Sequence, residues 1–129
     1  MVGDGPERFK AENLAKELGV AKDVIFLGSS NEVAKILCYS DVFLLPSETE
    51  SFGLAALEAM AASTAVISTN AGGLPEVNIH GKTGFLSEIE DVENMAKNTI
   101  TILENDSVLN EFKKSAKEHT KLFSLATIL

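Results

Sequence analysis

The feature that most constrains the fold is an alternation of strand-like and helical patterns along the chain. Short apolar runs at 24–27, 42–45 and 65–68 are separated by stretches whose apolar residues recur at helical spacing. Strands that are apolar at every position are typical of a parallel sheet covered on both faces. The sequence therefore predicts one α/β domain over 1–129, Rossmann-like, with a mostly parallel sheet flanked by helices.

The first two helices are predicted from their boundary residues and spacing. Pro6 stands at the start of the first and Gly19 follows its end. One face of this helix is expected to pack on the sheet, with Ala11, Leu14, Ala15 and Leu18. A second helix is predicted after a cap at Asn31, and Cys38 within it is interpreted as a small core residue.

A third helix is predicted at 52–63, where every residue from 54 to 62 except Glu58 is apolar. A helix that is apolar on nearly all sides is expected to be buried. Glycines and Pro75 then predict turns at 70–76, and Gly81 and Gly84 flank a short strand at 85–86.

Two further helices are predicted in the last third of the chain, the second after a cap at Asp106 or Ser107. Helical spacing predicts their inner faces as Val92, Met95, Ala96, Thr99 and Leu103 in one, and Val108, Leu109, Phe112 and Ala116 in the other.

Both ends are expected to be cut. Residues 4–6 resemble the turn after a strand of which only Met1 and Val2 remain, and the apolar tail at 123–129 lacks a helix-ending signal. Missing flanking elements would leave apolar faces uncovered, which the isolated piece could cover by dimerisation or by strand exchange.

Charge and cysteine usage exclude several classes of protein. A formal net charge of −8 argues against general binding to nucleic acid or to an anionic membrane surface. Cys38 is the only cysteine, so no internal disulfide forms, and the expected compartment is the cytoplasm. The single cysteine and two histidines lie far apart in sequence, which predicts no metal site and no metal cofactor.

The candidate site is the segment 46–54, which follows the strand at 42–45, together with Glu58. The carboxyl ends of parallel strands are where α/β proteins bind ligands, and a helix that begins there offers unpaired N–H groups to an anion. Gly53 would let an anion approach the backbone closely.

Spacing alone does not exclude a purely structural or solvent-exposed role for Glu50 and Glu58. Glu58 needs partners if it is buried, and either ribose hydroxyls or backbone N–H groups and a nearby lysine could supply them. Glu50 could equally be a solvated loop residue. Carboxylate pairs also serve glycoside hydrolysis, but there both acids flank one bond, whereas Glu58 is expected deep in a helix.

The segment at 50–58 resembles the E-x7-E motif of the retaining glycosyltransferases of family 4, which have the two-domain GT-B fold. Further segments match that family's C-terminal domain in order and spacing, namely 2–6, 24–28, 40–47, 71–76 and 81–86. Within the family, the resemblance is to bacterial enzymes that transfer N-acetylglucosamine to L-malate at the start of bacillithiol production.

The resemblance implies a role for each matching residue. Glu50 is the implied catalytic residue and would bind hydroxyls of the donor sugar. Phe52, Gly53 and Leu54 would present backbone N–H groups to the diphosphate, and Glu58 would hold the ribose. Leu27 and Gly28 would line the base pocket.

The implied function is donor binding in a retaining hexosyltransferase that uses UDP-N-acetylglucosamine as a substrate rather than a cofactor. The acceptor site would lie on an absent N-terminal domain, and the Arg and Lys that neutralise the diphosphate would precede Met1. The piece alone is thus expected to be inactive and to bind nucleotide weakly. The alternatives are a relative with another hexose donor and a glycan or lipid acceptor, at the membrane surface only if the acceptor is a lipid, or a non-catalytic nucleotide-binding module.

Overall fold

The computed structural model describes residues 7–27, 33–46 and 54–128, and it divides the chain into two compact units, 1–33 and 34–129. The described part of the first unit holds helix α1 (Glu7–Glu17) and the 3-10 helix η1 (Ala21–Asp23). Gly19 follows α1 with a φ of 73°, a left-handed conformation that glycine adopts at little cost.

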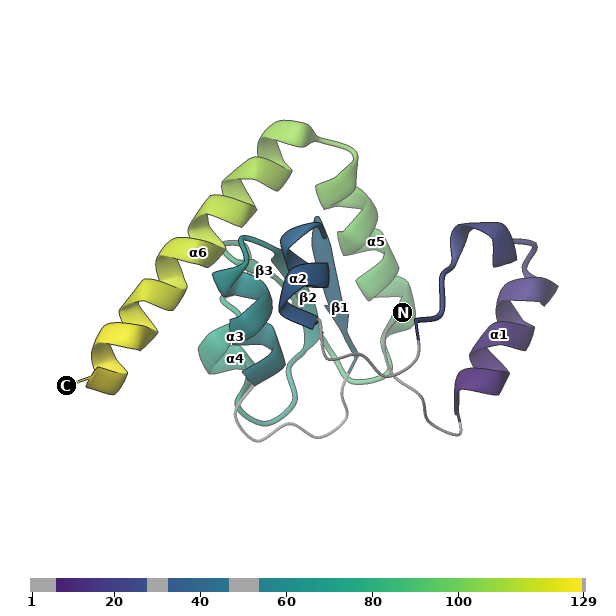
Figure 1. The fold of residues 1–129 in the computed structure, drawn as a ribbon, viewed down its shortest axis with the longest axis horizontal. Coiled ribbons are helices and arrows are strands. Elements are labelled where there is room, and N and C mark those ends of the chain that lie inside the picture. Colours follow the sequence, from purple (N-terminus) through teal and green to yellow (C-terminus); the bar gives the residue numbers. More distant parts are fainter. Residues whose placement is uncertain (1–6, 28–32, 47–53, 129) are drawn as a thin grey trace. The chain divides into compact units, whose positions relative to one another are not determined.

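The second unit contains a parallel three-stranded sheet in the order β1-β2-β3. The elements along the chain are α2 (Val33–Cys38), β1 (Val42–Leu45), α3 (Leu54–Ala61), β2 (Ala65–Thr69), α4 (Leu74–Val77), β3 (Gly84–Ser87), α5 (Val92–Leu103) and α6 (Asp106–Ile128). Figure 1 shows the helices of this unit flanking the sheet, with a tight turn joining α5 to α6. The predicted α/β architecture, with a parallel sheet flanked by helices, is confirmed.

The central strand β2 is buried at all five positions, as expected of a strand paired on both sides and covered on both faces. Its register places Val42 beside Ala65 and Val66 beside Gly84. The three predicted apolar runs therefore had different outcomes: those at 42–45 and 65–68 are strands, whereas 24–27 is not.

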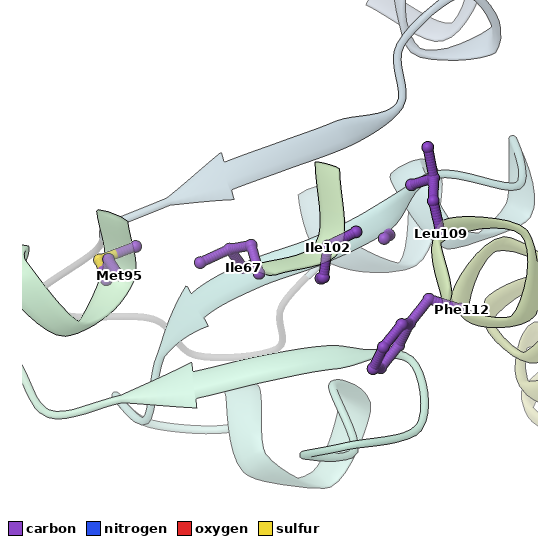
Figure 2. Packing of buried hydrophobic residues seen from close by; sticks show 6 residues of the cluster. Ile67, Met95, Ile102, Leu109 and Phe112 are labelled. Carbon is purple, nitrogen blue, oxygen red and sulfur yellow. The ribbon is translucent and has the colours of Figure 1, made fainter. Parts of the chain in front are cut away.

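One core lies between the sheet and the helices α5 and α6. It consists of Ala65, Ile67, Met95, Ile102, Leu109 and Phe112, with Val42, Phe85 and Val108 packed against it. In Figure 2 the labelled side chains of this cluster, Ile67, Met95, Ile102, Leu109 and Phe112, lie along the sheet. The ring of Phe112 lies 5.2 Å from that of Phe85 on β3. Each large apolar side chain removed from water in this way contributes roughly 1.5–3 kcal/mol before the entropy of ordering is subtracted.

Several predicted core positions are wrong. Ile25 is 69% exposed and Leu27 is 50% exposed, because the described part of their unit contains no strand with which they could pair. Leu14 and Leu18 of the predicted α1 face are also exposed, although Ala15 is buried.

Helix geometry explains two further corrections. In the short helix α2, Leu37 is buried and the next residue, Cys38, is turned outward and exposed. In α5, Met95 and Ile102 are buried, whereas Val92 is 72% exposed and Leu103 is 47% exposed. Met95 and Ile102 are seven residues apart and share one face of the helix, whereas Val92 and Leu103 are turned away from that face.

Helix caps and turns also differ from the prediction in part. The side chain of Asn105 accepts hydrogen bonds from the N–H groups of Ser107 and Val108, at 3.0 and 3.2 Å, so Asn105 caps α6 in place of Asp106 or Ser107. The predicted turn at 70–76 contains α4, with Pro75 in its first turn. Gly84, predicted as a turn residue, is the first residue of β3.

Candidate functional site

The carboxyl ends of β1, β2 and β3 lie at one edge of the sheet because the strands are parallel. We call this edge the rim; its last strand residues are Leu45, Thr69 and Ser87. The chain leaves the rim after each strand, toward α3, α4 and α5 in turn. This edge is where open α/β sheets bind ligands, because helix N-termini and loop residues gather there.

Four of the residues predicted for the site, Gly28, Glu50, Phe52 and Gly53, lie outside the described residues. Leu54 is the first residue of α3, and Leu27 is half exposed in the other unit. In chain order α3 follows β1, as the sequence predicts. The roles of these residues remain predictions.

Glu58 is exposed on α3, which corrects the expectation that this helix is buried on nearly all sides. Ala56, Ala59 and Met60 form its buried face, each 0% exposed. Within the described part of the chain, the Glu58 carboxylate makes no hydrogen bond or ion pair. Because the Glu58 carboxylate stays in solvent, it carries no desolvation penalty, and its oxygens can accept hydrogen bonds from ligand hydroxyls.

A buried polar network, which the sequence did not predict, fixes the segment between β2 and β3. The Asn78 side chain is 0% exposed and donates to the carbonyl of Val66 at 3.2 Å, the hydroxyl of Ser68 at 2.9 Å and the carbonyl of Phe85 at 3.2 Å. Its Oδ1 accepts from the Thr83 hydroxyl at 2.7 Å. Asn78 thus ties both strands to the end of α4. A single asparagine among turn-forming residues carries no sequence signal for such burial.

Two further residues near the rim stabilise the local fold. His80 is structural: its Nδ1 accepts from the N–H of Leu86 at 2.9 Å, and its ring contacts that of Phe85 edge-on at 5.3 Å. Gly72 has a φ of 50°, so the turn after β2 uses the left-handed conformation that glycine allows.

His119 on α6 is the group whose titration the described residues perturb. Burial, and secondarily the positive charge of Lys82, lower its pKa from the ordinary value of 6.5, while a hydrogen bond with the backbone of Val77 acts in the opposite direction. Both dominant causes disfavour the imidazolium form. The residue lies on the helix that packs on the sheet rather than on a strand end, and we assign it no role at the rim.

Residues 1–119 match the family model described as glycosyl transferases group 1. The chain belongs to this family. The match includes the segment 50–58, with both predicted acids, and all of the rim.

The names of similar family members describe different transferase activities. The chain is 43% identical over 118 residues to N-acetyl-alpha-D-glucosaminyl L-malate synthase of Bacillus anthracis, covering 92% of this chain and 31% of that protein. It is 37% identical to D-inositol 3-phosphate glycosyltransferase of Corynebacterium efficiens, covering 94% and 28%, and 35% identical to a sulfoquinovosyl transferase of Arabidopsis thaliana, covering 95% and 24%. The chain thus spans about a third or less of these relatives.

Solved structures place the fold within the family. The C-terminal domain of the group 1 family protein LpcC from Francisella tularensis matches with a TM-score of 0.82 and 29% identity, covering 89% of this chain and 60% of that one. HepE of Anabaena in complex with UDP matches with a TM-score of 0.85 and 26% identity, covering 94% and 35%. The chain therefore has the fold of the C-terminal domain of a group 1 glycosyl transferase. None of the helices that the structure describes has the length and apolar character needed to cross a membrane.

Proposed function

We propose that this domain binds the nucleotide-sugar donor in a retaining hexosyltransferase of the group 1 family. The observation that carries the proposal is the family match over residues 1–119, supported by the 43% identity to a transferase of N-acetylglucosamine. The complex of the similar HepE domain with UDP supports a uridine nucleotide as the ligand class. With a net charge of −8, such an anion would be held by local groups rather than by the overall field.

The proposed diphosphate site is the start of α3. The backbone N–H groups of Phe52, Gly53 and Leu54 would donate to the diphosphate, where the first turn of a helix has no internal acceptors for them. Leu27 and Gly28 would contact the base. These contacts need no metal ion, because the N–H groups and the helix dipole supply the positive potential.

The two acids of the segment 50–58 have separate proposed roles. Glu58 lies four residues into α3 from Leu54, on the same side of the helix and roughly 6 Å along its axis. Its exposed carboxylate would accept hydrogen bonds from the ribose hydroxyls. Glu50, before the helix, would accept from hydroxyls of the sugar and hold the reacting carbon near the acceptor.

The proposed chemistry retains the configuration of the sugar without a protein nucleophile. The bond between the sugar and the diphosphate breaks on the same face at which the acceptor hydroxyl attacks, and a diphosphate oxygen takes the acceptor proton. The protein contributes by stabilising negative charge on the departing diphosphate, which is the type of interaction with the largest effect on many enzymatic barriers.

The finer substrate assignment within this proposal is UDP-N-acetylglucosamine as donor and L-malate as acceptor. It is supported by the relative from Bacillus anthracis, whereas the relative from Corynebacterium efficiens is named for D-inositol 3-phosphate and that from Arabidopsis thaliana for a sulfoquinovosyl group. Transfer assays of the full-length enzyme, with a panel of UDP-hexoses against L-malate, inositol phosphate and glycan acceptors, decide between them.

The general proposal is tested by Glu50→Ala in the full-length enzyme, with Glu48→Ala as a control two residues earlier in the same run. Loss of one group that acts on the reacting sugar is expected to reduce kcat by about 10²–10³-fold, with the control near wild type. Equal turnover of the two variants would contradict the role of Glu50. Absence of any transfer by the wild-type enzyme, together with retained nucleotide binding, would favour the non-catalytic module.

A further inference from the structure

A recess lies on the rim, and none of its described lining residues belongs to α3. It has a volume of about 420 Å³ and opens beside the ends of β2 and β3. We call it the rim cavity, and it is lined by Asn70, Pro75, His80, Leu86, Ser87, Glu88 and Asn94. Its size lies within the range of roughly 300–1,000 Å³ that is common for small-molecule sites. All of its lining residues belong to the second unit and to the described part of the chain.

Hydrogen bonds hold the walls of the rim cavity in place. The N–H of Asn70 donates to the carbonyl of Ser87 at 3.0 Å, which joins the end of β2 to the end of β3. Asn94 Nδ2 donates to the Ser87 hydroxyl at 3.3 Å, and α5, which carries Asn94, is capped by the side chain of Asp91. The contact between Leu86 N–H and His80 Nδ1 fixes a third wall. A ligand would therefore meet groups that are already ordered, which reduces the entropy lost on binding.

The polar groups of this lining include both donors and acceptors. Because His80 Nδ1 accepts a hydrogen bond, the neutral imidazole carries its proton on Nε2, which is then a donor. The Ser87 hydroxyl accepts from Asn94 and keeps its own proton to donate. The side chains of Asn70 and Glu88 make no hydrogen bond among the described residues, and Oδ1 of Asn94 likewise remains available as an acceptor.

Charge excludes phosphate groups from the rim cavity. Its lining contains the carboxylate of Glu88 and neither lysine nor arginine, so a phosphate or a carboxylate ligand would be repelled without compensation. A sugar ring fits this lining, because each hydroxyl both donates and accepts and the ring carries no charge. Pro75 and Leu86 offer apolar surface to its C–H groups.

We propose that the rim cavity binds a neutral polyhydroxylated ligand, a sugar ring or a polyol, separately from the nucleotide. Its use in transfer rests on the proposed function, but the binding itself does not. The sugar could belong to the donor, reaching across the rim from the start of α3, or to a saccharide acceptor. L-Malate, as a dianion, would bind elsewhere.

The test is a titration of the ¹⁵N-labelled chain with N-acetylglucosamine, monitored by the amide resonances. We expect saturable shifts over roughly 1–50 mM at Leu86, Ser87 and Asn94, and none with inorganic phosphate or L-malate. The double variant Asn70→Ala/Glu88→Ala should bind at least tenfold more weakly. Asn110→Ala/Glu118→Ala, which changes the same two residue types at exposed positions on α6, is the matched control and should bind like wild type.

Two further arms identify the source of the sugar and keep the two proposals separable. If UDP-N-acetylglucosamine shifts the lining resonances and competes with the free sugar, the donor supplies the ring; if the two bind together, an acceptor does. UDP alone should shift resonances of α3 and leave the rim cavity unchanged, so its failure to bind would count against the nucleotide site only. Shifts that do not saturate, saturation by phosphate, or unchanged affinity in the cavity variant would overturn the polyol site.

Discussion

Substitution of Gly84 by alanine should force strand β3 away from its neighbour β2. A Cβ placed on Gly84 would fall on the carbonyl oxygen of Val66 and lie 2.6 and 2.9 Å from the carbonyl carbon and the nitrogen of the same residue. These are backbone atoms of the buried strand β2, so no side chain can rotate away to relieve the overlap. Either β3 moves away from β2 or the variant does not fold.

The size of the effect follows from the contacts that such a shift would break. Overpacking in a core costs about 1–3 kcal/mol when it can be relaxed. Displacement of β3 would also break the bond from Val66 N–H to Thr83 at 3.2 Å and the bond from Asn78 to Phe85 at 3.2 Å. Each buried group left without a partner costs about 1–3 kcal/mol, so the expected loss is about 5 kcal/mol, comparable to the whole stability of a small domain.

Gly81→Ala provides the matched control. Gly81 has a φ of 79°, and a Cβ there would meet nothing within 4 Å, so the cost is limited to the left-handed backbone, about 1–2 kcal/mol. Urea unfolding of both variants, followed by far-UV circular dichroism, measures the difference. If Gly84→Ala were no more than 2 kcal/mol less stable than Gly81→Ala, the close approach of β3 to β2 would be refuted.

Three further predictions concern side chains. Asn78→Ala should lower the free energy of unfolding by about 2–4 kcal/mol, because it removes the buried hydrogen bonds that Asn78 makes with two strand carbonyls and with the Thr83 hydroxyl; a loss below 1 kcal/mol in urea unfolding would contradict the network. Asn105→Ala should cost about 1 kcal/mol by removing the α6 cap, whereas Ser107→Ala should cost less, and equal losses would argue against Asn105 as the cap. The pKa of His119 is lowered from 6.5 in the folded state, so the unfolded chain binds more protons just below that pH, and the free energy of unfolding should fall as the pH drops from 6.5 toward the folded pKa. The urea midpoint should therefore decrease more steeply with falling pH in the wild type than in His119→Gln. Parallel curves for the two proteins would contradict the lowered pKa.

Local sequence predicted most of the elements because their signals are local. The runs at 42–45 and 65–68 became β1 and β2, and helical spacing located α5 and α6. The structure agrees with only part of what the sequence predicted for the site. Its position after β1 follows from the order of elements, but the exposure of Glu58 was the reverse of the expectation, since an apolar composition does not say which face of a helix has a neighbour.

Periodicity and motif spacing along the chain were enough to predict the α/β class, the parallel sheet and the family segments. Tertiary structure decided which apolar residues are covered: Val66 and Ile67 have strands on both sides, whereas Ile25 and Leu27 are exposed in a unit without a described strand. It also decided the burial of Asn78 and the polar lining of the rim cavity. The burial of Asn78 and the lining of the rim cavity both involve residues that are far apart in sequence. These residues come together only because parallel strands end at a common edge, which no local sequence pattern predicts.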